Sequence, residues 1–284
     1  MVFASPLITP ARLLDNLDNP DWIIFDCRHE LANPGYGEMV YGEGHLPGAR
    51  FAHLDRNLSS PPSPEHGRHP LPDEATFTGW LGSQGVTPDK TVVAYDNQGM
   101  FSARLWWLMI ALGHKKVHVL DGGYRAWQKD SAPTTTELPA IHPARYVGNF
   151  NRSMIVELDE MEKIFQSRDV LLVDARGKDR YLGKSEPLDK AAGHIPGARN
   201  IPFPGNVDEE GQFRDANFLK ERFGIAKEVE HPDNIIHYCG SGVSACHNIL
   251  AMAIAGLQPG RLYAGSWSQW CANPQRPVET EPNL

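Results

Sequence analysis

The sequence predicts an α/β protein in which one domain occurs twice, each copy being a mainly parallel sheet with helices on both faces. The first observation is that short apolar runs alternate with stretches whose apolar residues recur at helical spacing. Strands that alternate with helices form parallel sheets, and strands covered on both faces are apolar throughout. The second observation is that this whole pattern occurs twice. The third is that a polar, proline-rich stretch separates the two occurrences.

Four segments of the first half return in the second half in the same order. The pairs are Ile23–Asp26 with Leu171–Asp174, Gly44–Arg50 with Gly193–Arg199, Val92–Asp96 with Ile235–Cys239, and Tyr124 and Trp127 with Trp267 and Trp270. One such match could be a shared turn, but four collinear matches indicate a duplicated domain. The stretch 131–153 is rich in Pro, Ser and Thr, which is typical of a linker. We therefore predict a first domain over 1–135, a linker over 136–152 and a second domain over 153–284.

Apolar spacing predicts the elements of each copy in order. In the first copy it predicts a helix near 13–17, a strand at 22–25, a helix around 77–81, a strand at 91–95 and a helix through 105–112. In the second copy it predicts a helix over 158–165, a strand at 170–173, a strand at 235–238 and a helix from about 244 to 255. The Gly-His-Leu/Ile-Pro-Gly-Ala-Arg segment that both copies share predicts a turn leading into a strand, because proline fixes φ and glycine permits the turn.

Composition limits the possible partners. The 284 residues carry 27 Lys and Arg against 35 Asp and Glu, a formal net charge of −8, which disfavours binding to nucleic acid or to an anionic membrane. The longest apolar stretches, 105–112 and 249–257, are much shorter than the roughly 20 residues that span a bilayer. The four cysteines form no Cys-x-x-Cys pair, so we expect a cytoplasmic protein with reduced thiols and no structural metal.

The two copies differ most where the fourth matched strand ends. The first copy has Asp96 at this point, whereas the second has Cys239 followed by Gly240-Ser241-Gly242 and a helix. A cysteine there lies over a helix N-terminus at the carboxyl edge of a parallel sheet, where open α/β sheets bind ligands. Backbone N–H groups and the positive helix end lower the pKa of a thiol and hold anions. We therefore predict that Cys239 is a functional thiolate that can carry a persulfide.

Other chemistry-bearing residues support weaker alternatives. The remaining cysteines, Cys27, Cys246 and Cys271, are expected to be small buried residues, and a resolving role for Cys246 has little support. Phosphatases whose loop runs from Cys through five residues to Arg have a similar architecture, but the Arg position is Ala245 here, so the guanidinium clamp for phosphate is missing. His66 and His69 lie in the proline-rich stretch Ser59–Pro72 without further ligands, so we predict an ordered loop there and no metal site.

The whole chain resembles the two-domain rhodanese family, the thiosulfate/3-mercaptopyruvate sulfurtransferases. The segments that carry the resemblance are Asp174-Ala175-Arg176, Gly193-His194-Ile195-Pro196-Gly197-Ala198 and the loop from Cys239 to Ala245. In this family the first domain lacks the cysteine and often has Asp in its place, as at Asp96 here. The resemblance implies two tandem rhodanese-like domains, the second being catalytic.

Within the family, the loop sequence distinguishes donors. Members that prefer thiosulfate resemble Cys-Arg-Lys-Gly-Val-Thr, with two cations for a dianion, whereas members that prefer mercaptopyruvate resemble Cys-Gly-Ser-Gly-Val-Thr. This chain has the second type, with Ser244 in place of Thr. The resemblance therefore implies that Gly240, Gly242, Val243 and Ser244 form a neutral donor-binding loop.

The donor's carboxylate needs a cation. By resemblance, Arg180 matches the arginine that family members supply after the Asp-x-Arg strand; the alternative is a solvated surface arginine. Mercaptopyruvate enzymes usually have a second arginine after Glu-Pro, but here Glu186-Pro187 is followed by Leu188-Asp189-Lys190. Lys184 or Lys190 could substitute, although a lysine cannot form the bidentate fork of an arginine. This departure leaves the donor open.

The resemblance also implies a proton relay. Ser241 matches the family's loop serine, and His45 matches its histidine, although His45 equally fits a structural role in the shared turn. No acid has a secure counterpart, Glu38 and Glu43 being nearby in sequence.

The predicted activity is transfer of a sulfane sulfur from 3-mercaptopyruvate, through a Cys239 persulfide, to cyanide or to a thiol such as a small thiol or thioredoxin. It needs no metal or organic cofactor. Two alternatives remain open: a thiosulfate sulfurtransferase that uses the same persulfide, and a non-enzymatic module that only carries or presents sulfur.

Overall fold

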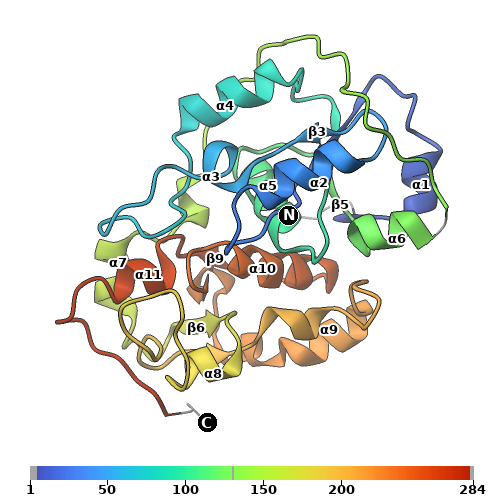
Figure 1. Ribbon diagram of the computed structural model, residues 1–284. Coiled ribbons are helices and arrows are strands. Elements are labelled where there is room, and N and C mark those ends of the chain that lie inside the picture. The colour runs from blue at the N-terminus through green and yellow to red at the C-terminus, as the bar shows by residue number, and fades with distance from the viewer. Residues whose placement is uncertain (1–4, 130, 282–284) are drawn as a thin grey trace. The chain divides into compact units, whose positions relative to one another are not determined.

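The chain folds into two compact α/β units, as the duplication predicts. The computed structural model describes residues 5–129 and 131–281, so the ends of both predicted domains, 1–4 and 282–284, lie outside the described residues. The first unit comprises Met1–Ser60, Pro72–Asn151 and Val207–Phe213, and the second comprises Pro61–Leu71, Arg152–Asn206 and Arg214–Leu284 (Figure 1). Each unit therefore includes a short segment, 61–71 or 207–213, from the other half of the sequence.

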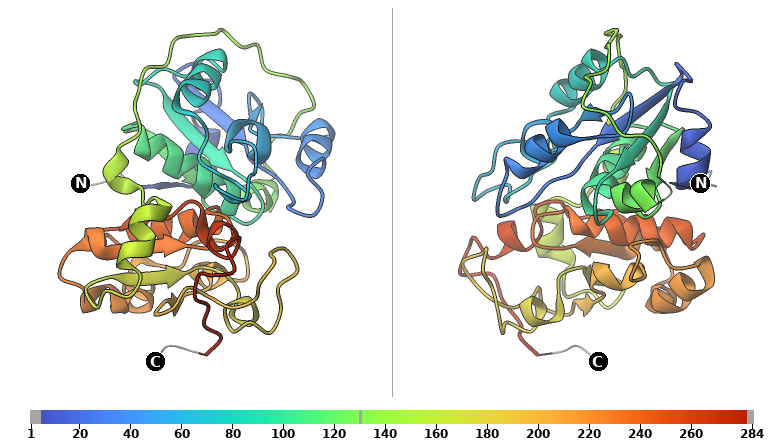
Figure 2. Two further views of the ribbon diagram at one scale, coloured as in Figure 1. Left: turned by 90° about the vertical axis from the view of Figure 1, so that its left-hand side faces the viewer. Right: turned by 45° about the vertical axis from the view of Figure 1, so that its right-hand side comes forward.

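The first unit contains a five-stranded parallel sheet with the strand order β1-β5-β4-β2-β3. Its strands are β1 (Leu7–Ile8), β2 (Trp22–Asp26), β3 (Arg50–Phe51), β4 (Thr91–Tyr95) and β5 (Val117–Leu120). Its helices are α1 (Pro10–Leu14), α2 (Tyr36–Glu43), α3 (Leu54–Asn57), α4 (Glu74–Ser83), α5 (Met100–Ala111) and α6 (Gly123–Lys129). Helices cover both faces of the sheet (Figure 2).

The second unit contains a four-stranded parallel sheet with the order β7-β6-β8-β9. Its strands are β6 (Leu171–Asp174), β7 (Arg199–Asn200), β8 (Ile235–Tyr238) and β9 (Arg261–Leu262). Its α-helices are α7 (Leu158–Ile164), α8 (Lys178–Tyr181), α9 (Ala216–Arg222), α10 (Ser244–Ile254) and α11 (Ser266–Trp270). Short 3₁₀ turns occur at Arg152–Met154, Phe203–Asn206, Gly224–Glu228 and Pro232–Asn234. The predicted fold class is confirmed in both units.

The first helix begins earlier than the sequence predicts, because capping residues set its start. The first helix begins at Pro10 and ends at Leu14, because the Thr9 side chain accepts a hydrogen bond from the N–H of Arg12 and Pro10 occupies the first helical position. The stretch 136–151 has no helix or strand, yet it packs on the first unit. The N–H of Ala144 donates to the carbonyl of Gly82 over 2.8 Å, and the N–H of Asn151 donates to the carbonyl of Ala111 over 2.7 Å.

The repeated Asp-x-Arg segment lies at the end of an inner strand of each sheet, β2 or β6, and links it to the shared turn. In the second unit, Arg176 donates to the carboxylate of Asp174 and to the carbonyl of Gly193, each over 2.6 Å. Its guanidinium also lies 4.7 Å from the ring centre of Trp267. Burial alone would lower the pKa of Arg176, but the Asp174 carboxylate outweighs burial and raises it. Arg28 makes the equivalent contacts with Asp26 and Gly44, which explains why this motif occurs in both copies.

Arg176→Met should therefore destabilise the second unit by about 3–5 kcal/mol, because it leaves the buried Asp174 carboxylate without its partner. The measurement is urea-induced unfolding followed by tryptophan fluorescence. Arg199→Met is the matched control, since Arg199 forms a partly exposed ion pair with Glu228 at 3.6 Å and such pairs contribute about 0–1 kcal/mol. Equal unfolding curves for the two variants would contradict the assigned role of Arg176.

Candidate active site

The loop between β8 and α10 places Cys239 at the carboxyl end of a buried strand. Cys239 is 2% exposed and follows Tyr238, the last residue of β8, and α10 begins five residues later at Ser244. The loop is held against the start of α11 by three hydrogen bonds. The N–H of Cys239 donates to the Ser266 hydroxyl oxygen over 3.1 Å, and the carbonyls of Cys239 and Gly240 accept from the backbone N–H groups of the next two residues, Trp267 and Ser268.

Gly242 lets the loop curl. Its φ is +76°, in the left-handed region, and a Cβ at this position would lie 2.5 Å from the carbonyl oxygen of Ala264. The curl leads into the first turn of α10, where the N–H of Cys246 donates to the carbonyl of Val243 over 3.1 Å. Ser241, Val243 and Ser244 are all buried in this arrangement.

The first copy shows what such a loop binds. There Asp96 follows β4, and its carboxylate accepts hydrogen bonds from the backbone N–H groups of Gln98, Gly99, Phe101 and Ser102. The equivalent positions in the second copy are Ser241, Gly242, Ser244 and Ala245. Burial raises the pKa of the Asp96 carboxyl, and the loop N–H groups oppose that rise. In the first copy the loop is thus a cup of N–H groups that holds a carboxylate, and Cys239 occupies the equivalent position of the second copy.

Ser241 has a histidine partner, but the histidine is His69. The Nδ1 atom of His69 lies 2.6 Å from the Ser241 hydroxyl oxygen, and both residues belong to the second unit. His69 was expected only to lie in an ordered loop. A comparison of the two copies could have indicated His69. The segment 61–71, which belongs to the second unit, contains His69, whereas the segment 207–213, which belongs to the first unit, contains no histidine.

The expectation that His45 partners Ser241 is corrected by the structure. His45 is fully buried in the first unit, and its Nδ1 and Nε2 atoms lie 2.8 Å and 3.1 Å from the carbonyl oxygens of Tyr41 and Glu137. Its ring also stacks on the Tyr41 ring with centres 3.9 Å apart. His194, the equivalent residue of the second copy, makes the same contacts with Tyr181. The shared histidine is therefore structural, because both ring nitrogens of His45 are engaged by the backbone.

Two arginines flank Gly240. A Cβ built on Gly240 would lie 2.7 Å from Nη2 of Arg68 and 3.3 Å from Nη1 of Arg180. Arg180 is the cation that the sequence indicated, and it donates from Nη2 and Nε to the Glu186 carboxylate, the shortest bond being 2.7 Å. Arg68 was not singled out from the sequence. It adjoins His69 in the segment 61–71, and its backbone N–H donates to the Ser268 hydroxyl oxygen over 3.1 Å.

Asp189 links the two arginines. One carboxylate oxygen bonds to Arg68 Nη1, and the other lies 3.2 Å from Arg180 Nη2. Asp189 and Glu186 are 5% and 3% exposed, whereas the arginines are 26% and 22% exposed, so buried carboxylates hold guanidiniums that reach the surface. Lys190, one of the two lysines suggested as a substitute, lines a neighbouring cavity of about 280 Å³ together with Arg68, Asp189 and Cys271.

The other cysteines occupy buried positions. Burial raises the pKa of the Cys27 thiol well above its usual value and also raises that of Cys271. The Cys246 sulfur lies 3.2 Å from the carbonyl oxygen of Gly242 and donates its hydrogen bond there. These surroundings are those of small packed residues, as the sequence predicts.

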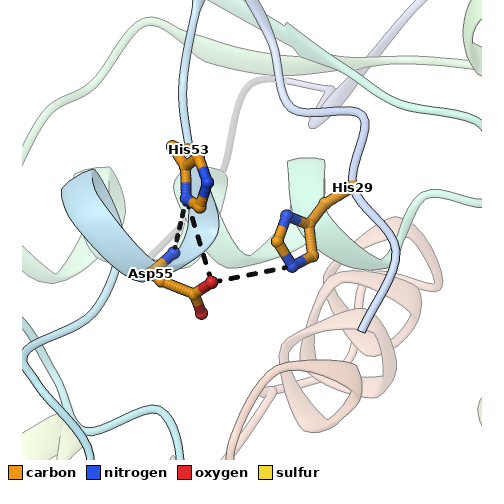
Figure 3. Close-up of side chains that lie close together, drawn as sticks. All are labelled: His29, His53 and Asp55. Carbon is orange, nitrogen blue, oxygen red and sulfur yellow. Dashed lines mark hydrogen bonds and ion pairs between the residues drawn. The ribbon is translucent and has the colours of Figure 1, made fainter. Parts of the chain in front are cut away.

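A cluster of His29, His53 and Asp55 in the first unit has the composition of a metal site (Figure 3). The nearest carboxylate oxygen of Asp55 lies 4.0 Å from Nε2 of His29 and 4.0 Å from Nδ1 of His53. However, Nδ1 of His53 accepts the backbone N–H of Asp55 over 3.1 Å and so caps α3. Burial lowers the pKa of His53, which keeps the ring neutral for that role. The contacts therefore fit a helix cap. His66 and His69 are each paired with a serine hydroxyl instead.

A family model described as the rhodanese-like domain matches residues 9–130 and 157–273. The chain therefore belongs to the rhodanese family, and it is an enzyme of the sulfurtransferase class. It is 40% identical to the probable 3-mercaptopyruvate sulfurtransferase of Pseudomonas aeruginosa, over 98% of this chain and 99% of that protein. It is 37% identical to the thiosulfate sulfurtransferase of Cricetulus griseus, over 84% of this chain and 81% of that protein.

Among solved structures, the chain resembles SseA from Escherichia coli, described as a 3-mercaptopyruvate sulfotransferase. The TM-score is 0.77 at 30% identity, over 93% of this chain and 99% of that one. In the part of the chain that the structure describes, no helix has the length and apolar character needed to cross a membrane.

Gly242→Ala should disrupt the loop, because the new Cβ would meet the Ala264 carbonyl as well as adopt a left-handed φ. We expect it to lower the free energy of unfolding by roughly 2–4 kcal/mol. Gly256→Ala is the matched control: its φ is +70° but no atom lies within 4 Å of the new Cβ, so only the conformational cost of about 1–2 kcal/mol remains. Thermal unfolding of both variants measures the difference, and a smaller loss for Gly242→Ala would contradict the close packing of the loop.

Proposed function

We propose that this sulfurtransferase takes the sulfur of 3-mercaptopyruvate onto Cys239 as a persulfide and passes it to a thiol or to cyanide. The observation that carries the proposal is the cup of N–H groups around the loop. Its counterpart in the first copy holds a carboxylate with four backbone hydrogen bonds, and in the second copy the same position carries a thiol. The cup therefore stabilises first the Cys239 thiolate and then the terminal sulfur of the persulfide.

In the first half-reaction, the Cys239 thiolate attacks the thiol sulfur of mercaptopyruvate. An S–S bond forms and the C–S bond breaks, and its electron pair leaves on carbon as the enolate of pyruvate. The proton of the donor thiol ends on that carbon, so the products are a Cys239 persulfide anion and pyruvate. In the second half-reaction, a thiolate or cyanide attacks the outer sulfur, and Cys239 leaves as the thiolate.

The proton needs a carrier because it moves from sulfur to carbon. Ser241, two residues after Cys239, lies within hydrogen-bond distance of His69 at 2.6 Å, and the pair supplies a hydroxyl and an imidazole for this transfer. Arg180, whose Nη1 lies beside Gly240, orients the donor's carboxylate. No metal or organic cofactor takes part in this scheme.

We choose 3-mercaptopyruvate as the sulfur donor from the charge of the loop that follows Cys239. Residues 240–244 carry no charge, and the two nearby guanidiniums are matched by the carboxylates of Glu186 and Asp189. Such a site suits a monoanionic keto acid better than the thiosulfate dianion. The relatives include proteins named for each donor, so a thiosulfate sulfurtransferase with the same persulfide is the second candidate. Initial rates with the two donors and one common acceptor decide between them: the proposal requires a higher kcat/KM for mercaptopyruvate.

Cys239→Ser should abolish sulfur loading. After treatment with mercaptopyruvate, we expect the intact mass of the wild type to rise by about 32 Da, one sulfur atom, and that of Cys239→Ser to stay unchanged. Cys246→Ser is the control, because its sulfur is engaged with the Gly242 carbonyl and should not be loaded. Loading that persists without Cys239 would refute the scheme. A loaded protein that excess thiol does not discharge would contradict the proposed transfer to a thiol acceptor.

His69→Asn should lower kcat with mercaptopyruvate by roughly 10²–10⁴-fold, the usual contribution of a general acid–base. The loss should be much smaller with thiosulfate, which has no S–H proton to move. His66→Asn is the matched control, since His66 lies on the same segment but is exposed and paired with Ser63. An equal loss with both donors would show that His69 only supports the loop.

A further inference from the structure

A second cavity of the second unit lies away from the catalytic loop. Its volume is about 410 Å³, larger than the cavity of about 280 Å³ that Lys190 lines. Its wall includes Leu171 and Arg199, the first residues of β6 and β7. Cys239 instead follows the last residue of β8, and these strands are parallel. The cavity and the catalytic loop therefore lie at opposite edges of the same sheet.

Part of the cavity wall is apolar. The apolar side chains that line it are Phe165, Val170, Leu171, Pro196 and Val229. Leu171 is 6% exposed, and the Phe165 ring packs edge-on against the Trp270 ring with centres 5.1 Å apart. Val170 also packs against the core of the unit. The core thus fixes the shape of this wall, which suits the apolar part of a small molecule.

Charged side chains of both signs line the same cavity, namely Arg168, Arg199, Glu228 and Glu279. Arg199 and Glu228 form a loose ion pair at 3.6 Å. A carboxylate oxygen of Glu279 accepts the backbone N–H of Gly197 over 3.1 Å, which holds this side chain at the wall. Arg168 is exposed and has no ion pair within the described part of the chain. Its guanidinium is therefore available for an anionic group of a ligand.

We infer that this cavity binds a zwitterionic α-amino acid with an apolar side chain. Arg168 binds the ligand's carboxylate, Glu228 and Glu279 bind its ammonium group, and the apolar wall contacts its side chain. A simple anion or cation would meet like charges on the same wall, whereas a neutral zwitterion matches both signs. Ligand cavities are roughly 300–1,000 Å³ in volume, and this one is near the lower limit, as a single amino acid requires. The inference does not depend on the sulfur donor, because the catalytic loop lies at the other edge of the sheet.

Three probes with the same apolar group test the charge pattern. They are L-leucine, 4-methylpentanoate, which lacks the ammonium group, and 3-methylbutylamine, which lacks the carboxylate. By isothermal titration calorimetry we expect the wild type to bind L-leucine at least about tenfold more tightly than either of the others, since each of those lacks a charge-assisted hydrogen bond. Equal affinity for L-leucine and a singly charged probe, or no L-leucine binding at about 10 mM, would overturn the inference.

Two variants test the residues assigned to the ligand. Arg168→Gln should weaken L-leucine binding by about tenfold and Glu228→Gln by roughly fivefold, because each removes one charge that the zwitterion contacts. Arg214→Gln and Glu230→Gln are the matched controls, since both residues are exposed in the same unit and neither lines the cavity. Thermal unfolding at the wild-type temperature establishes that each variant is folded. L-Leucine binding that is unchanged in both Arg168→Gln and Glu228→Gln, or weakened equally in the controls, would contradict the assigned site.

Discussion

Backbone N–H groups that converge on one buried point at the carboxyl end of a parallel strand are the constraint on which this site depends. In the first copy these N–H groups belong to Gln98, Gly99, Phe101 and Ser102, and burying them without a partner would be costly. The first copy satisfies the donors permanently with the Asp96 carboxylate. The second copy has the Cys239 sulfur at the equivalent position, and we propose that it carries the transferred sulfur there.

Comparing the two copies distinguishes residues that support the fold from residues that differ around the loop. The Asp-x-Arg pair, the turn after it and its buried histidine are the same in both copies, and they make the same contacts in both. The copies differ in the residue inside the cup and in the segments they exchange. The segment 61–71 brings His69 and Arg68 to the catalytic loop, whereas 207–213 packs on the first unit, with the N–H of Phe213 donating to Asp121 over 2.9 Å.

Charge is balanced locally around the cup. The chain as a whole is negative, so an anionic donor is attracted only by local cations and N–H groups. The guanidiniums of Arg68 and Arg180 lie beside Gly240, and the buried carboxylates of Asp189 and Glu186 limit their excess charge and fix their direction. An arginine held in this way loses less side-chain entropy when it binds a ligand, since the rotamer is already restricted.

The sequence by itself determined the duplication, the α/β class and the position of Cys239, because these follow from local patterns: apolar runs, a repeat, and glycines between a strand and a helix. Cys239 could be identified from the sequence because the loop and the helix around it are formed by the residues that directly follow it. His69 and Arg68 could not, since the residues they contact lie far along the chain and no local pattern encodes that proximity. His45 was assigned wrongly for the same reason: its sequence motif is visible, but only the folded chain shows that backbone carbonyls occupy both ring nitrogens. Tertiary structure alone decided which polar side chains reach the cup, because that choice depends on how distant segments pack.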